Sequence, residues 1–163
     1  MPEADRNGLA TGSSGAAVIS ARRPPATGGA ELASPRMRAT AESARQARLW
    51  FRGCLQPWCH AGPAGAGAAA DAESVFGELA ANAIRHSRRW WRVTVTVSPD
   101  AVRCDVRDGS WRAPRDGWLW LPGRESGRGL TIVKDLASTW GYRRHLWGKT
   151  VWFELRPAQP GPA

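Results

Sequence analysis

Apolar residues recur at helical spacing early in the chain. In SARQARLWFRGCLQPW, residues 43 to 58, apolar side chains repeat every three to four positions, while Arg45, Arg48 and Arg52 lie on the opposite side. The repeating positions are Ala44, Ala47, Trp50, Phe51, Cys54 and Leu55. This pattern predicts an amphipathic helix with a basic outer side that ends near Pro57.

A second helical pattern follows a segment rich in Gly and Ala. Residues 59 to 70, CHAGPAGAGAAA, are predicted to form a flexible loop, after which Asp71 is expected to be the N-cap of a helix. The apolar positions of that helix are Val75, Phe76, Leu79, Ala83 and Ile84. Within it, the stretch ELAANAIRHS sets Glu78, Asn82 and His86 at intervals of one turn.

Alternating positions predict two strand pairs. RVTVTV and AVRCDVRD alternate apolar and polar residues around the turn SPD, which indicates a hairpin with Val102, Cys104 and Val106 on one face. YRRHLW and KTVWFELR are predicted to form a second antiparallel pair joined through Gly148. Between the pairs, GRGLTIVKDLASTW is expected to form a helix that ends at Gly141.

The order of these elements predicts the fold class. Helix, helix, hairpin, long loop, helix and hairpin follow one another, which is typical of an α+β two-layer sandwich with helices on one face of a mixed, mostly antiparallel sheet. The long loop, residues 109 to 126, carries three Trp, so we expect it to be functional.

Three regions are expected along the chain. Residues 1 to 35 are rich in Gly, Ala, Ser and Pro without periodicity, so they are predicted to be a disordered extension. Residues 36 to 156 form the predicted folded domain, and residues 157 to 163 a disordered tail.

Composition limits the classes of partner. With 23 basic and 14 acidic residues the net charge is +9, which favours an acidic or phosphorylated partner. Three Cys cannot complete a disulfide framework, so free thiols and a reducing, cytoplasmic location are expected. No run approaches the roughly 18 apolar residues needed to cross a membrane, and no signal-peptide core is found. We therefore expect no membrane partner.

Three short motifs carry candidate chemistry. Glu78 and Asn82 lie at the edge of the buried side of their predicted helix, where polar groups need partners, although a solvated face is the simpler alternative. Asp108 leaves the second strand and could accept a hydrogen bond from an exocyclic amine, or could only form an Asp-Gly turn. SGRGL places Gly127 and Gly129 before a helix, where free amides attract phosphate oxygens.

Together these motifs resemble the ATP-binding domain of the GHKL superfamily, and most closely its anti-sigma-factor serine/threonine kinase branch. ELAANAIRHS is similar to the family's N box, and VRDGS to its first Gly box. Residues 126 to 155 resemble the second Gly box with the strands that follow it. The resemblance implies a histidine-kinase-like (Bergerat-type) fold and a protein that binds ATP and Mg²⁺.

The resemblance also implies a role for each matching residue. Asn82 would coordinate Mg²⁺, and Glu78 would act as the general base for the attacking hydroxyl. Asp108 would read the adenine amine, and Thr150 would back the adenine pocket. The phosphates would be held by a glycine turn that comprises Gly127, Arg128, Gly129 and Leu130. In this family the protein partners are a sigma factor and an anti-anti-sigma factor that is phosphorylated; the sequence leaves homodimerisation open.

Departures from the family pattern keep other functions open. DGSWR lacks the second Gly of the usual first Gly box, so a nucleotide-binding interaction protein without catalysis is one alternative. HSRRWWR mixes cations and aromatics, which makes a basic, Trp-rich nucleic-acid-binding module the other, although a nucleic-acid partner is disfavoured. Cys54, Cys59 and His60 lack a fourth zinc ligand, which argues against structural zinc.

Overall fold

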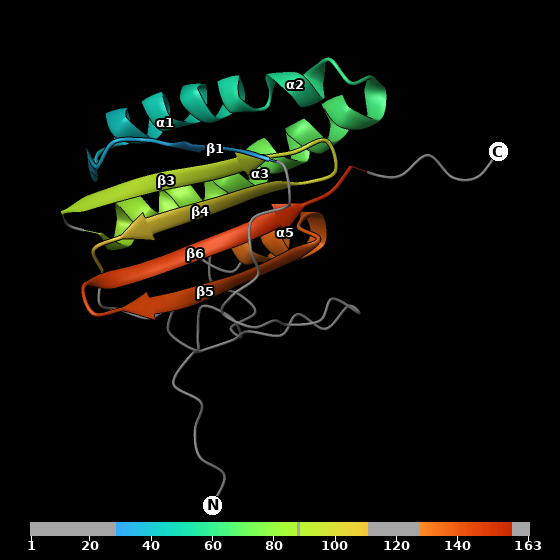
Figure 1. The fold of residues 1–163 in the computed structure, drawn as a ribbon. Helices are drawn as coiled ribbons and strands as arrows, with labels where there is room; N and C mark the ends of the chain where they lie inside the picture. Colours follow the sequence, from blue (N-terminus) through green and yellow to red (C-terminus); the bar gives the residue numbers. More distant parts are fainter. Residues whose placement is uncertain (1–28, 88, 111–127, 158–163) are drawn as a thin grey trace, which may run out of the picture.

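The structure is a computed structural model that describes residues 29–87, 89–110 and 128–157. It confirms the predicted α+β fold, with helices gathered on one face of a sheet in which every strand pairing described is antiparallel (Figure 1). None of the helices in this part of the chain is long and apolar enough to cross a membrane.

The sheet is built around the predicted hairpin. β3 (Trp90–Val97) pairs with β4 (Val102–Asp108), and the last hairpin, β5 (Thr139–His145) with β6 (Gly148–Leu155), joins it through β4 and β6. The strand order is β1-β3-β4-β6-β5, in which β1 is Ala30–Ala33, and β2 (Met37–Arg38) also pairs with β3. The last hairpin confirms the predicted second pair, with Gly148 as the first residue of β6.

The helix layer consists of α1 (Ala41–Cys54), the short α2 (Gln56–Cys59), α3 (Pro63–His86) and α5 (Arg128–Leu136). α3 lies between α1 and α5 and packs on β4 and β6. The core joins the two layers through Phe51, whose ring stacks on Phe76 at 4.3 Å and meets the edge of Phe153 at 6.4 Å. The apolar stripes predicted for the first two helices are therefore largely the buried ones.

A hydrogen-bond chain fixes α1 against the sheet. Thr40 caps α1 by accepting from the Ser43 amide at 3.2 Å, and the Ser43 hydroxyl donates to the Arg38 carbonyl at 2.6 Å. The indole of the fully buried Trp91 donates to the same hydroxyl at 3.0 Å. One serine therefore connects the start of α1 with β3 and with β2 (Met37–Arg38).

The start of the folded region differs from the prediction. Residues 30 to 33 form β1 (Ala30–Ala33), which pairs with β3 over Thr94 to Val97, so these residues do not belong to a disordered extension. Leu32 is exposed, so apolar burial gave no sequence signal for this strand. The ladder with β3 supplies its order through backbone hydrogen bonds. Residues 1 to 28 and 158 to 163 lie outside the described residues.

The predicted Gly and Ala loop is largely helical. α3 begins at Pro63 after Gly62, which has a φ of 100°, so Asp71 lies within the helix and is not its N-cap. The high helix propensity of the alanines outweighs the cost of the two glycines. Gly65 also lets α3 approach the Trp58 carbonyl, where a Cβ would collide. The first predicted helix, expected to end near Pro57, ends at Cys54, and the separate short helix α2 then spans Gln56–Cys59.

The third predicted helix ends earlier than expected. α5 stops at Leu136, and Trp140 and Gly141 already belong to β5. Gly141 is buried against the ring of Trp152, where a side chain would collide at 2.9 Å, so its role is in strand packing rather than helix termination. The long loop predicted to be functional falls mostly on residues 111 to 127, which lie outside the described residues.

Candidate functional site

Several elements meet at one end of the sheet. β4 ends at Asp108 and β6 begins at Gly148, and Asp108 pairs with Lys149 across the two strands. α5 starts at Arg128 and runs away from this end, because β5 follows it and begins opposite Glu154 at the far end of β6. The N-terminus of α5 is therefore directed toward the end of the sheet that carries Asp108.

The side chains of Glu78, Asn82 and His86 lie along one edge of α3, on the side away from α1. α1 contacts the other side, where Arg52 pairs with Glu73 at 2.7 Å and Arg48 donates to the Gly77 carbonyl at 3.3 Å. With 3.6 residues per turn, Asn82 points about 140° away from Gly77 around the helix axis. Because α3 lies between α1 and α5, Asn82 is on the α5 side, and Glu78 is one turn earlier on the same edge.

Glu78 and Asn82 are both half-buried. Within residues 29–87, 89–110 and 128–157, neither side chain forms a hydrogen bond or an ion pair. Further along the same edge, His86 is close enough to Asp108 for its charge to act on that carboxyl. Glu78, Asn82 and His86 therefore lie along one edge of α3, as the periodicity predicts, and His86 approaches the end of β4.

Asp108 is buried and held by Ser110 and Lys149. Its Oδ1 accepts from the Ser110 amide at 2.7 Å and from Lys149 Nζ at 3.2 Å, while Oδ2 lies 3.0 Å from the same Nζ. Only 3% of the Asp108 side chain and 6% of the Lys149 side chain are exposed. This ion pair is therefore shielded from water, and its electrostatic interaction is much stronger than on the surface.

Burial and the ion pair shift the pKa of the Asp108 carboxyl in opposite directions. Removal from water raises the pKa of Asp108, and the charge of Lys149, the Ser110 amide and His86 each lower that pKa; the net shift is upward. Burial is therefore the dominant influence on this pKa, and Lys149 is the strongest of the groups that oppose it.

A glycine allows the close approach at this point. Gly148 has a φ of 128°, and a Cβ built on it would collide with the Asp108 carbonyl oxygen. A side chain at this position would push the start of β6 away from the end of β4. Gly148 thus sets the backbone contact that brings Lys149 to Asp108.

Thr150 lies on the opposite face of the sheet from Asp108. It pairs with Arg107 rather than Asp108, and its hydroxyl is 2.7 Å from Nε2 of His145. Successive side chains alternate between the two faces of a strand, so Lys149 and not Thr150 is beside Asp108. The structure therefore does not bring Thr150 together with Asp108, as the adenine-pocket role implied by the resemblance would require.

The residues of the glycine turn fall at the limit of the described chain. Arg128, Gly129 and Leu130 form the first turn of α5, and Gly127 lies outside the described residues. The first backbone N–H groups of a helix have no partner within it, so this turn can attract an anion.

Sequence reasoning missed Lys149. A signal for it was present, because Val151, Phe153 and Leu155 alternate along β6 and face the core. Extending that alternation backward places Lys149 on the helix side and Thr150 outside.

The cysteines confirm the predicted free thiols. Cys54 and Cys104 are buried, and Cys59 is half-buried. Complete burial raises the pKa of Cys104 well above its ordinary value, consistent with its predicted position in the core. In the part of the chain that the structure describes, no three His, Cys, Asp or Glu side chains form a cluster that could hold a metal ion.

Comparison with known proteins gives one result at the level of the family. A family model described as the histidine kinase-like ATPase domain matches residues 37–155, which is more than half of the chain. No curated protein matches the sequence. The matched residues include α3, the end of β4 and the start of β6, where the site residues lie.

Proposed function

The chain belongs to the family of histidine kinase-like ATPase domains, and on this premise we propose that it is an ATP-binding regulator that phosphorylates Ser or Thr on an anti-anti-sigma partner. In this proposal its helical surface holds a sigma factor. The observation that carries the proposal is the position of Glu78 and Asn82, which are half-buried on the α5 side of α3 and form no side-chain hydrogen bond with any described residue.

Asp108 fits the exocyclic amine of adenine. A carboxylate has about four acceptor sites, and the contacts with Ser110 and Lys149 use three of them. One acceptor site on Oδ2 therefore remains for an N–H donor. Because the carboxylate is buried, a hydrogen bond formed there is stronger than the same bond in water.

Asn82 fits a hard cation. Mg²⁺ prefers oxygen ligands, and the amide oxygen of Asn82 is not used by any described residue. Asn82 is held on a regular helix, so its position is fixed relative to the N-terminal turn of α5. When bound, the cation would supply neutralisation of the charge on the phosphates.

Glu78 would assist the incoming hydroxyl. It lies one turn before Asn82 on the same edge and, among the described residues, has no cationic partner to hold its carboxylate in an ion pair. A carboxylate in that state can accept a proton from the Ser or Thr hydroxyl of a protein substrate. Arg128, Gly129 and Leu130 in the N-terminal turn of α5, together with the preceding Gly127, would bind the phosphates.

Two substitutions on α3 test the proposal. Asn82→Ala is expected to abolish binding of Mg·ATP, because it removes the cation ligand. Glu78→Ala is expected to leave binding intact and to slow phosphate transfer about a hundredfold or more, as for loss of a general base. Ser74→Ala, an exposed position on the same helix, is the control.

Calorimetric titration with ATP, with and without Mg²⁺, measures binding. Transfer is measured from radiolabelled ATP to anti-anti-sigma-type proteins of the same genome. Equal ATP affinity in the wild type and Asn82→Ala would show that the assignment is wrong.

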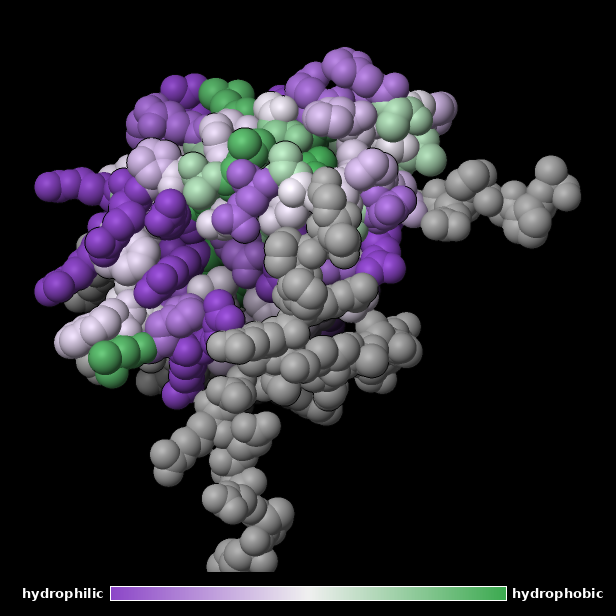
Figure 2. Space-filling view, in the orientation of Figure 1, coloured by the Kyte–Doolittle hydropathy of each residue, from purple (hydrophilic) through white to green (hydrophobic). Residues whose placement is uncertain are grey.

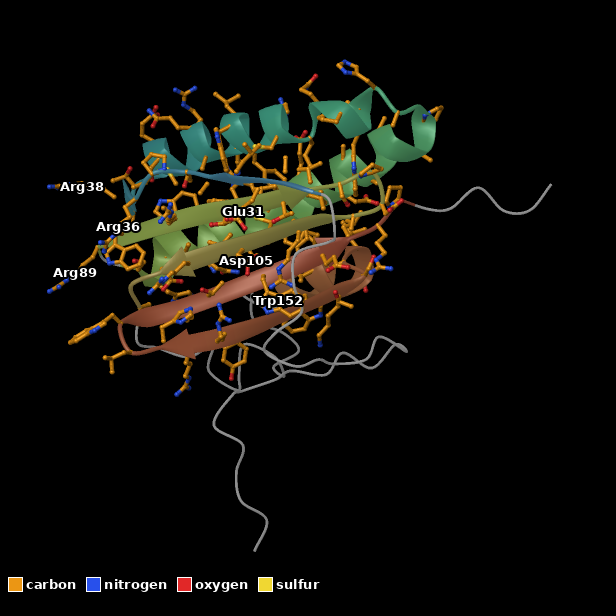
Figure 3. The ribbon with its side chains drawn as sticks, viewed as in Figure 1. Glu31, Arg36, Arg38, Arg89, Asp105 and Trp152 are labelled. Carbon is orange, nitrogen blue, oxygen red and sulfur yellow. The ribbon has the colours of Figure 1, made fainter. Side chains whose placement is uncertain are left out.

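One observation favours a second candidate, a nucleic-acid-binding module. On the outer face of the sheet Arg92 is directly opposite Arg107, and like charges in this position destabilise a sheet. Arg36 lies over the Trp90 ring at 4.0 Å, and Arg107 is 5.8 Å from it. Figure 3 shows Arg36, Arg38 and Arg89 at this same end of the sheet, where hydrophilic residues gather in Figure 2.

None of these arginines forms an ion pair with a carboxylate of the described chain, whereas Arg45, Arg52, Arg103 and Arg156 each do. Uncompensated cations of this kind attract phosphates. Filter binding with single-stranded oligonucleotides separates the candidates. Strong, salt-dependent affinity that Mg·ATP does not change would favour the nucleic-acid module over the kinase.

A further inference from the structure

Lys149 and Asp108 form a neighbouring donor and acceptor inside the protein. Their charged atoms are 3.0 Å apart at Oδ2, and both side chains are more than nine-tenths buried. Buried ion pairs often contribute little net stability, because removing both charges from water costs as much as their attraction returns. The pair therefore invites a functional explanation.

The hydrogen-bonding capacity of the pair is incomplete. An ammonium group has three N–H donors, and the two oxygens of Asp108 can take at most two of them. Within the described residues, Lys149 Nζ has no other acceptor. Asp108 likewise retains one acceptor site on Oδ2. The pair thus offers one free donor beside one free acceptor.

The Watson–Crick edge of adenine presents the complementary groups. Its N6 amine donates, and its N1 accepts; both are attached to the same ring carbon, so the groups that read them must be neighbours. Oδ2 and Nζ meet this requirement. Thr150, on the opposite face of the sheet, does not.

We propose that Lys149 is a specificity-determining residue that donates a hydrogen bond to N1 of adenine while Asp108 accepts from N6. This inference rests on the proposed ATP-binding function and deepens it. The ammonium also lowers the pKa of Asp108, which favours the ionised carboxylate that accepts from the amine. Gly148 makes the arrangement possible by letting the start of β6 approach the Asp108 carbonyl.

The test uses the wild-type protein and two ATP analogues in calorimetric titrations. One analogue is 1-deaza-ATP, which has C–H in place of N1, and the other is purine riboside triphosphate, which lacks the 6-amine. Loss of a hydrogen bond to a charged group weakens binding about tenfold to a hundredfold. Both analogues are expected to bind more weakly than ATP by that factor.

Variants assign the N1 contact to one residue. In Lys149→Met the difference between ATP and 1-deaza-ATP is expected to disappear, while purine riboside triphosphate still binds more weakly than ATP. Lys134→Met removes the other, exposed lysine of the chain and should retain the wild-type pattern. If Lys149→Met does not fold, the analogue series on the wild type decides.

The titrations distinguish failure of the proposed role of Lys149 from failure of the proposed ATP binding. Wild-type protein that binds ATP and 1-deaza-ATP equally overturns the role of Lys149 and leaves ATP binding standing. A loss of discrimination in Lys134→Met equal to that in Lys149→Met also overturns it. Wild-type protein that binds no ATP overturns both proposals.

Discussion

Lys149 and Thr150 are adjacent in sequence but lie in contrasting environments on the two faces of one strand. On the helix side, Lys149 neutralises Asp108 where water is excluded. On the outer side, Thr150 contacts His145, and the exposed Arg92 lies directly opposite the exposed Arg107. Because both arginines are exposed, water and ions screen the repulsion between them.

The comparison shows how burial decides the arrangement of charge. A buried charge needs a partner, so the inner face holds a matched pair at fixed distance. An exposed charge is solvated and can remain without one. A fixed, dry pair is suited to recognising a particular ligand edge, whereas a solvated row of cations is suited to general attraction of anions.

The largest expected difference in stability is between two variants that each lack one carboxylate, Asp108 on the inner face or Asp105 on the outer face. Asp108→Ala leaves Lys149 buried without a partner and should lower the free energy of unfolding by about 3–5 kcal/mol. Asp105→Ala removes the partner of Arg103 on the outer face, where both side chains are partly exposed, and should cost about 0–1 kcal/mol. Urea unfolding monitored by circular dichroism measures both. Equal losses would show that the two faces do not differ in this way.

A smaller effect is expected from Thr150→Val. The substitution removes the hydroxyl that contacts His145 and should cost about 1 kcal/mol of stability. Because the side chain is on the outer face, affinity for Mg·ATP should equal that of the wild type. Thr96→Val, a buried threonine on the same face, is the control for the change of side chain. A large loss of ATP affinity in Thr150→Val, but not in Thr96→Val, would show that Thr150 does contribute to the adenine pocket.

The smallest effect concerns the titration of His145. Burial lowers the pKa of His145, and Arg107 and Arg143 lower it further, from an ordinary value of 6.5. Arg107→Gln should therefore raise this pKa toward 6.5, as measured by NMR of the imidazole ring. Arg45→Gln, on α1, should leave it unchanged.

The lowered pKa of His145 makes the stability of the protein depend on pH. Because the pKa of His145 is lowered on folding, the unfolded chain takes up the proton first as the pH falls below 6.5. The contribution of neutral His145 to stability is complete above that pH and is lost as the pH falls through the folded pKa. In Arg107→Gln this loss should be smaller. An unchanged or lower pKa in that variant would contradict the repulsion inferred for the outer face.

Hydrophobic periodicity predicted the helices and strands that bury one side, and it missed the elements that are ordered by backbone hydrogen bonds or helix propensity. The stripes of α1 and α3 and the alternation of β3, β4 and β6 were visible because Phe51, Val75 and Val106 must avoid water. β1 was missed because its four residues are exposed and held by the ladder to β3. The start of α3 was misplaced because Gly62 and Pro63 were assigned to a loop.

For the site, spacing predicted the line of Glu78, Asn82 and His86, which is a property of one helix. Which side chain is beside Asp108 depends on the register between β4 and β6, and the spacing of the motifs along the chain does not determine that register. The alternation from Val151 to Leu155 would have indicated Lys149, had the core been used to orient the strand. The family motif pointed instead to Thr150.

The two outermost strands bear on how this protein behaves when concentrated. An open sheet edge offers unpaired backbone groups to a neighbouring copy, which is a common route to aggregation. The short strands β1 (Ala30–Ala33) and β2 (Met37–Arg38) form one edge, and β5 carries exposed Arg143 and Arg144 at the other. Short strands at one edge and charged side chains at the other should limit edge-to-edge pairing of two copies.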